Sequence, residues 1–182
     1  MAAAARVDAG SDGGAIVPGA PIQFEVGRPY GVRFSSKVII KDLTGDGRPD
    51  LVGLNHWDNF IEVKPGNGSG SFAAPAITST HNHSQQETFL LADYDRDGDL
   101  DVALPHGTTL DWFTNDGTGR FAAGPSSSIS TFDQLAITDV TGDGVPDVIA
   151  ANQGALAVYK GLAAGGFATT ATNSPCLTAR GA

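Results

Sequence analysis

Three short acidic segments recur along the chain and constrain its fold more than any other feature. They read DLTGDGRPD, DYDRDGDLD and DVTGDGVPD and occupy residues 42–50, 93–101 and 139–147, which we call loops one, two and three. Each loop lies between short apolar runs, and a glycine turn ending in phenylalanine follows 28–30 residues after its first aspartate. A set of parts that returns every 46–51 residues indicates a repeat protein.

The parts of one repeat have the character of strands. The apolar runs are too short for helices, contain branched residues and end at Gly, Pro, Asn or Asp. We therefore expect an all-β fold in which each unit has four strands, with the acidic loop between the first two. These two strands are apolar at consecutive positions, which predicts that both of their faces are covered. Such units fit the blades of a β-propeller, whereas a β-sandwich would not place the same loop in every unit.

The repeats divide the chain into three parts. Three blades are expected over residues 19–170, with a flexible N-terminal segment at 1–18 and a C-terminal tail at 171–182. Propellers usually have four to eight blades, so three blades leave exposed terminal faces that favour association. Two arrangements stay open: a homodimer that completes a six-bladed ring, or an open fragment of a larger propeller.

The negative charge of the chain is concentrated in the three loops. The formal net charge is -9, and eleven of the 20 acidic residues lie in the loops. The rest of the chain is nearly neutral and has no basic stripe, which argues against a nucleic-acid partner. Acidic residues confined to three loops indicate bound cations instead.

The spacing of oxygen-bearing residues in the loops predicts calcium. Positions 1, 3, 5 and 9 offer side-chain oxygens, position 6 is glycine and position 7 offers a backbone carbonyl, a donor set that suits Ca²⁺. The predicted ligands of loop one are Asp42, Thr44, Asp46, the carbonyl of Arg48, and Asp50. Those of loop two are Asp93, Asp95, Asp97, the carbonyl of Asp99, and Asp101; those of loop three are Asp139, Thr141, Asp143, the carbonyl of Val145, and Asp147. Loop two carries the most carboxylates and is expected to bind most tightly.

Two other kinds of loop have a similar sequence. An EF-hand needs glutamate at position 12 and flanking helices, but position 12 is Gly53, Leu104 or Ala150 and the flanks are predicted strands. Metal-free Asp-Gly turns would explain one such loop more readily than three with the same spacing.

The three repeats resemble the FG-GAP/VCBS repeat family, the calcium-loop blades of integrin α-like propellers and of many secreted proteins. The resemblance rests on IIKDLTGDGRPDLVGLN, LLADYDRDGDLDVALP and AITDVTGDGVPDVIAAN, with the trailing GSGSF, GTGRF and AGGF. It implies calcium ligands at the loop positions given above. Thr44 and Thr141 depart from an all-acidic loop, which lowers the affinity expected there. The family includes adhesion proteins, lectins and accessory domains of enzymes, so the resemblance leaves the function open.

Few other residues suggest chemistry. His81 and His83 form a His-x-His pair that suits zinc or copper, but no third ligand is evident. No nucleophile, base and acid can be assembled, so we do not expect an enzyme. Trp57 falls in a turn beside Asn55 and His56, and these three residues are the predicted platform for a sugar or a protein ligand.

The sequence thus predicts a noncatalytic module with three structural calcium ions that recognises a glycan or a protein. Weak calcium sites suit the extracellular space or the cell surface, although residues 1–15 do not resemble a secretory signal. No apolar run approaches the roughly 20 residues of a membrane span. The alternative is a structural or accessory propeller domain of a larger secreted enzyme or adhesion protein.

Overall fold

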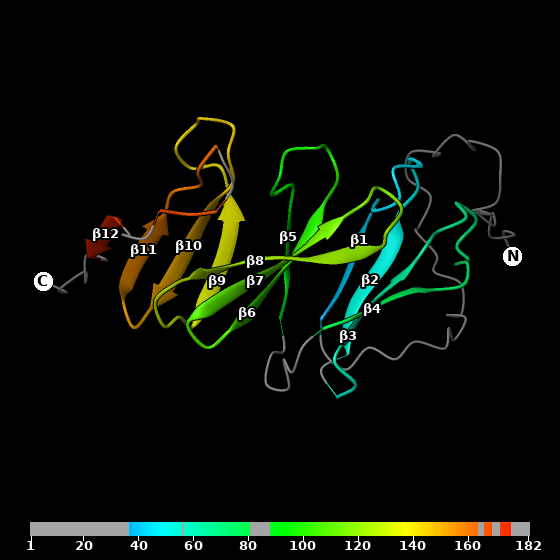
Figure 1. Ribbon diagram of the computed structural model, residues 1–182, viewed down its shortest axis with the longest axis horizontal. Coiled ribbons are helices and arrows are strands. Elements are labelled where there is room, and N and C mark those ends of the chain that lie inside the picture. Colours follow the sequence, from blue (N-terminus) through cyan, green and yellow to red (C-terminus); the bar gives the residue numbers. More distant parts are fainter. Residues whose placement is uncertain (1–36, 56, 81–87, 164–165, 169–171, 176–182) are drawn as a thin grey trace, which may run out of the picture.

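The chain forms three separate four-stranded antiparallel sheets, one for each repeat (Figure 1). The computed structural model describes residues 37–55, 57–80, 88–163, 166–168 and 172–175, and this part of the chain contains twelve strands and no helix. Strands follow one another in chain order within each sheet. The predicted all-β architecture of blade-like units is therefore confirmed.

The strand bounds match the predicted order of parts. The first sheet contains β1 (Val38–Lys41), β2 (Asp50–Asn55), β3 (Phe60–Lys64) and β4 (Ala76–Ser79). The second contains β5 (Leu90–Ala92), β6 (Asp101–His106), β7 (Thr109–Asn115) and β8 (Phe121–Ser128). The third contains β9 (Gln134–Thr138), β10 (Asp147–Asn152), β11 (Ala155–Tyr159) and β12 (Thr172–Pro175).

The C-terminal boundary predicted from the sequence is too early. β12 lies within residues 171–182, the predicted tail, yet it pairs with β11 from Val158↔Thr172 to Ala155↔Pro175. The third sheet therefore extends to Pro175. The predicted boundary at residue 18 lies outside the described residues.

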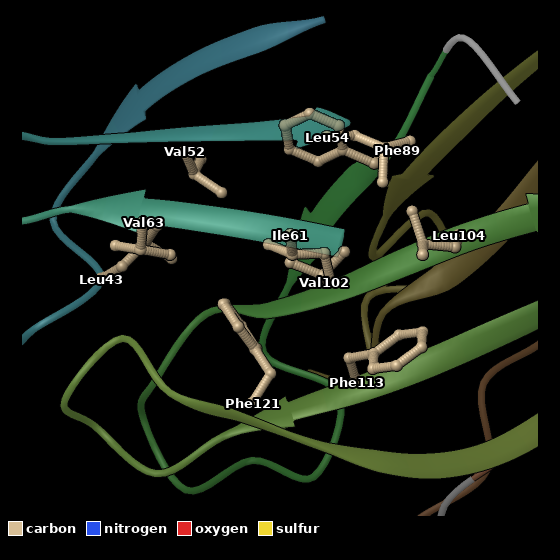
Figure 2. Close-up of a cluster of buried hydrophobic side chains, with 10 residues drawn as sticks. All are labelled: Leu43, Val52, Leu54, Ile61, Val63, Phe89, Val102, Leu104, Phe113 and Phe121. Atoms are coloured by element: carbon tan, nitrogen blue, oxygen red, sulfur yellow. The ribbon is translucent and has the colours of Figure 1, made fainter. Parts of the chain in front are cut away.

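The hydrophobic core is divided between two layers, one on each side of the second sheet. Figure 2 shows the first layer, in which side chains of the first and second sheets interlock. Its members are Leu43, Val52, Leu54, Ile61, Val63, Phe89, Val102, Leu104, Phe113 and Phe121. The second layer joins the second and third sheets and includes Ala103, Trp112, Val148, Tyr159 and Phe167.

The second strand of the central sheet is covered on both faces, as the sequence predicted. In β6, Val102 belongs to the first core layer and Ala103 to the second, and both are fully buried. The period-2 alternation of a strand places neighbouring side chains on opposite faces. Consecutive apolar residues are therefore required where a sheet has a neighbour on each side.

The prediction that the first strands are covered on both faces is wrong for β1 and β9. Val38 and Ile40 are 45% and 60% exposed, whereas Ile39 between them packs against the first core layer. In β9, Leu135 and Ile137 pack inward and Ala136 is exposed. These strands belong to the two outer sheets, and only one face of each outer sheet meets another described sheet.

The three sheets stand in a row, with the second between the other two (Figure 1). The outer faces of the first and third sheets point away from each other, so the described part of the chain forms an open array and not a closed ring. Within that part, no helix is long and apolar enough to cross a membrane.

Candidate cation-binding loops

Each acidic loop joins the first strand of its sheet to the second, and its last aspartate opens the second strand. That aspartate is fully buried in all three units, at Asp50, Asp101 and Asp147. In loop one, Asp50 Oδ2 accepts hydrogen bonds from the N–H groups of Leu43 (2.8 Å) and Thr44 (3.0 Å). Its Oδ1 accepts from the N–H of Gly66 (2.8 Å), just beyond β3.

The same arrangement recurs in the other two units. Asp101 accepts from the N–H groups of Tyr94 and Asn115, both at 2.7 Å. Asp147 accepts from Val140 (2.9 Å), Thr141 (3.0 Å) and Gly161 (2.8 Å). We call this set of bonds the aspartate clasp, because one carboxylate ties the start of the loop to the end of the third strand. The sequence identified these aspartates only as ligands and missed the clasp.

Loop two brings together three of its predicted ligands. Asp93, Asp95 and Asp101 each offer a carboxylate oxygen, and these oxygens lie within 4.8 Å of one another. Of the described residues, no other His, Cys, Asp or Glu residues form a group of three this close. Burial, with smaller contributions from Asp95 and Asp97, raises the pKa of Asp101 to about 6. Asp97 and Asp99 lie outside the cluster, and Asp97 Oδ1 accepts from the N–H of Asp99 (2.9 Å).

The first aspartate of loops one and two has one oxygen that its surroundings leave unpaired. Asp42 Oδ2 accepts from the N–H of Gly47 (2.8 Å), and Asp93 Oδ2 accepts from the N–H of Gly98 (3.2 Å). The Oδ1 atoms of Asp42 and Asp93 are buried and have no hydrogen-bond partner among the described residues, and the same holds for Thr44 Oγ1. Buried oxygens without hydrogen-bond partners are rare and reduce stability. Oxygen atoms of this kind are suited to coordinating a hard cation.

The remaining residues of loop one are paired within the loop. Asp46 Oδ1 accepts from the N–H of Arg48 (2.8 Å), and its Oδ2 forms an ion pair with the Arg48 guanidinium (2.7 Å). The N–H of Arg48, and then its guanidinium, lower the pKa of Asp46. Both side chains are exposed, so solvent screens this pair.

Loop three departs from the other two. Asp139 Oδ1 accepts from the N–H groups of Gly142 (2.6 Å) and Asp143 (3.3 Å), and its Oδ2 accepts from Gly144 (2.8 Å). Asp143 Oδ2 lies 3.0 Å from the ammonium of Lys160. The Lys160 ammonium lowers the pKa of Asp143, and the Gly144 N–H lowers that of Asp139. Among the described residues, loop three therefore has no buried, unpaired side-chain oxygen like those of Asp42 and Asp93.

The other predicted metal ligands have simple surroundings. Val145 has a buried hydrocarbon side chain, so its backbone carbonyl is the only group that it can offer to a metal. Thr141 is exposed, and its backbone N–H is used by the clasp.

The turn that carries Trp57 is built differently from its counterparts. Pairing of β2 with β3 ends at Asn55↔Phe60, so four residues intervene. The equivalent turns in the other sheets have two, since pairing ends at His106↔Thr109 and Asn152↔Ala155. Trp57 is 78% exposed at this longer turn.

Asn55 supports the turn and is not available to a ligand, which corrects its predicted role. It is 4% exposed; its Oδ1 accepts from the N–H groups of Trp57 and Asp58, and its Nδ2 donates to Asp58 Oδ2 (3.0 Å). His56, His81 and His83 lie outside the described residues.

Comparison with known families supports the repeat assignment. Residues 42–104 match the profile described as an FG-GAP-like repeat. This part of the chain is an FG-GAP-like repeat. The matched FG-GAP-like segment contains loops one and two, so the resemblance inferred from the loops is confirmed.

Two solved structures are similar to the chain. One is a mutant Tc holotoxin pore of Photorhabdus luminescens, with 18% identity, a TM-score of 0.58, and a match that covers 78% of this chain and 7% of that one. The other is TcdB2-TccC3, with 29% identity, a TM-score of 0.50, and coverage of 62% and 6%. The first similarity shows the fold alone. The chain thus spans a small fraction of the length of both, and no curated protein sequence matches it.

Proposed function

We propose that the chain is a noncatalytic β-propeller module that calcium stabilises and that serves as an accessory part of a larger extracellular protein. The observation that carries this proposal is the pair of buried, unpaired oxygens at the same loop position, Asp42 Oδ1 and Asp93 Oδ1. One such atom would be an isolated defect, whereas the same atom in two repeats indicates a common ligand.

Calcium would act by neutralising negative charge and by coordinating the oxygen atoms that have no hydrogen-bond partner in the protein. Asp42 and Thr44 would hold it in loop one, and Asp93, Asp95 and Asp101 in loop two. Two carboxylates about 4 Å apart repel by roughly 4 kcal/mol at an effective dielectric constant of 20. A divalent ion converts that repulsion into attraction, and the flexible all-oxygen donor set favours Ca²⁺ over Mg²⁺.

Calcium removal should lower the thermal stability of the chain. A site contributes about 2.7 kcal/mol when the free calcium concentration is about 100 times its dissociation constant. This corresponds to a melting temperature roughly 5–10 °C higher with calcium than with chelator.

The substitution Asp93→Asn should reduce the calcium affinity of loop two by about tenfold or more, because it removes a charge and one ligand oxygen.

The matched control is Asp99→Asn, which removes the same charge from the same loop outside the carboxylate cluster. Calorimetric titration and thermal melting of both variants measure the difference. An identical melting curve with millimolar calcium and after thorough chelation would contradict the proposal.

The accessory assignment follows from the lengths of the similar structures. Those two chains contain a region like this one in 7% and 6% of their length. A three-sheet array whose outer faces meet no other described sheet also suits a part that is completed by other protein. An extracellular location fits because calcium there is millimolar.

We further propose glycan recognition through Trp57. Its indole is 78% exposed on a turn that is two residues longer than its counterparts and is fixed by the buried Asn55. A large exposed aromatic ring on a fixed turn is suited to stacking against a sugar.

Binding of calcium-loaded protein to a glycan array tests this role. Trp57→Ala should abolish binding and Trp57→Phe should retain part of it, while both leave the melting temperature unchanged because the side chain is exposed. Equal binding by Trp57→Ala would assign recognition to another surface, and no binding by the unmodified chain would leave a protein as the partner.

A further inference from the structure

We infer that loop three needs no divalent ion, because the protein itself satisfies two of its aspartates: backbone N–H groups bind Asp139 and the Lys160 ammonium pairs with Asp143. This inference rests on the proposed calcium sites of loops one and two. It changes the expected number of calcium ions per chain from three to two.

The first support is the state of the leading aspartate. In loops one and two this residue keeps one buried oxygen unpaired, at Asp42 and Asp93. In loop three the equivalent Asp139 is exposed, and its two oxygens accept three backbone hydrogen bonds. No side-chain oxygen of loop three is both buried and unpaired within the described residues. The turn itself has taken up the acceptors that a metal would use.

The second support is the position of Lys160 in the repeat. The clasp fixes the alignment of the units, because Gly66, Asn115 and Gly161 are the equivalent donors to the last aspartate. The residue before each donor is Pro65, Thr114 or Lys160. Only the third unit therefore has a positive charge at this position.

The third support is electrostatic. The Lys160 Nζ lies 3.0 Å from Asp143 Oδ2. Hydrogen bonding and attraction from Asp143 raise the pKa of Lys160, and the charges of Asp147 and Asp139 raise it further. The ammonium thus pairs with Asp143, and the negative charges of Asp147 and Asp139 add to the attraction. A calcium ion would have to displace it from Asp143 and overcome its repulsion.

The arginines of the other two loops leave the candidate metal ligands of those loops unsatisfied. Arg96 is the one basic residue of loop two, and its Nη2 donates to the Ala163 carbonyl (2.9 Å), away from the carboxylate cluster. Arg48 pairs with Asp46 but leaves Asp42 Oδ1 and Thr44 Oγ1 unsatisfied.

Calcium stoichiometry tests the inference directly. Equilibrium dialysis of the full chain with radioactive calcium should give two ions for the unmodified protein and for Lys160→Arg, which keeps the charge. Lys160→Thr, which installs the residue of the second unit, should add a third ion by raising the affinity of loop three about tenfold or more. Three ions in the unmodified chain, or two in Lys160→Thr, would overturn the inference.

Melting without metal separates this inference from the calcium proposal. If the unmodified chain binds no calcium, the proposed function fails, but the part played by Lys160 is still tested. In chelator, Lys160→Thr should melt below the unmodified chain while Lys160→Arg matches it, and adding Asp143→Asn to Lys160→Thr should produce no further loss. An unchanged melting temperature for Lys160→Thr would show that the ammonium does not hold the loop, and the inference would fall.

Discussion

At the scale of single residues, the last aspartate of each loop forms the clasp, and that of loop two is also a candidate metal ligand. Asp50 and Asp147 each accept three backbone hydrogen bonds, and Asp101 accepts two while also belonging to the carboxylate cluster. Acceptance of several N–H bonds stabilises a buried carboxylate without any metal. The clasp therefore contributes to stability whether or not the loop binds an ion.

The clasp predicts a metal-independent cost for Asp50→Asn. An asparagine side chain has one acceptor oxygen, so its NH₂ group would face a backbone N–H and leave that donor unsatisfied. We expect a loss of roughly 2–3 kcal/mol in the free energy of unfolding, measured by urea denaturation in chelator. Asp46→Asn, which removes the same charge from an exposed position, should cost much less, because solvent screens its ion pair with Arg48. Equal losses for the two variants would exclude the clasp as a source of stability.

At the scale of strands and loops, the sequence predicts what depends on local pattern. The second strands and the loop positions follow from apolar runs and Asp-Gly spacing, and the structure places them as expected. The predicted cover of β1 and β9 is wrong because an apolar run does not tell whether a neighbouring sheet exists. Position in the array, not composition, decides that Ile40 is exposed while Val102 is buried.

The missed contacts share one cause, which is distance along the chain. The Gly66 N–H reaches Asp50 across 16 residues, and Lys160 reaches Asp143 across 17. Both depend on the length of the intervening hairpin, which local spacing does not fix. A signal for the clasp was nevertheless present, since Asp50 opens a strand and alternation places it on the same face as the buried Val52.

At the scale of the whole molecule, the two ends of the array expose apolar side chains that equivalent residues bury elsewhere. Leu43, the second residue of loop one, is 1% exposed against the second sheet, whereas its counterpart Val140 is 50% exposed. Leu156 is exposed on the outer face of the third sheet, and Val38 and Ile40 on that of the first. The internal contacts show what covers such faces in the repeat, namely another sheet of the same kind.

This exposure predicts that the isolated chain associates. We expect sedimentation to give about twice the mass of one chain, as two three-bladed arrays close on each other. Leu156→Asp should shift the equilibrium toward monomer by placing a charge in the interface. Ala122→Asp, at an exposed position on the central sheet, should leave the mass unchanged. A monodisperse monomer for the unmodified chain would favour closure by other blades of a longer protein.

The aspartate clasp also bears on how such repeats diverge. All hydrogen-bond donors of the clasp are backbone N–H groups, which every substitution except proline preserves. A blade that keeps its last aspartate therefore keeps its geometry while the other residues of its loop change. Blades with ion-dependent loops and blades with ion-independent loops are then able to occur in one polypeptide. A loop is able to gain or lose its ion without unfolding the neighbouring blades.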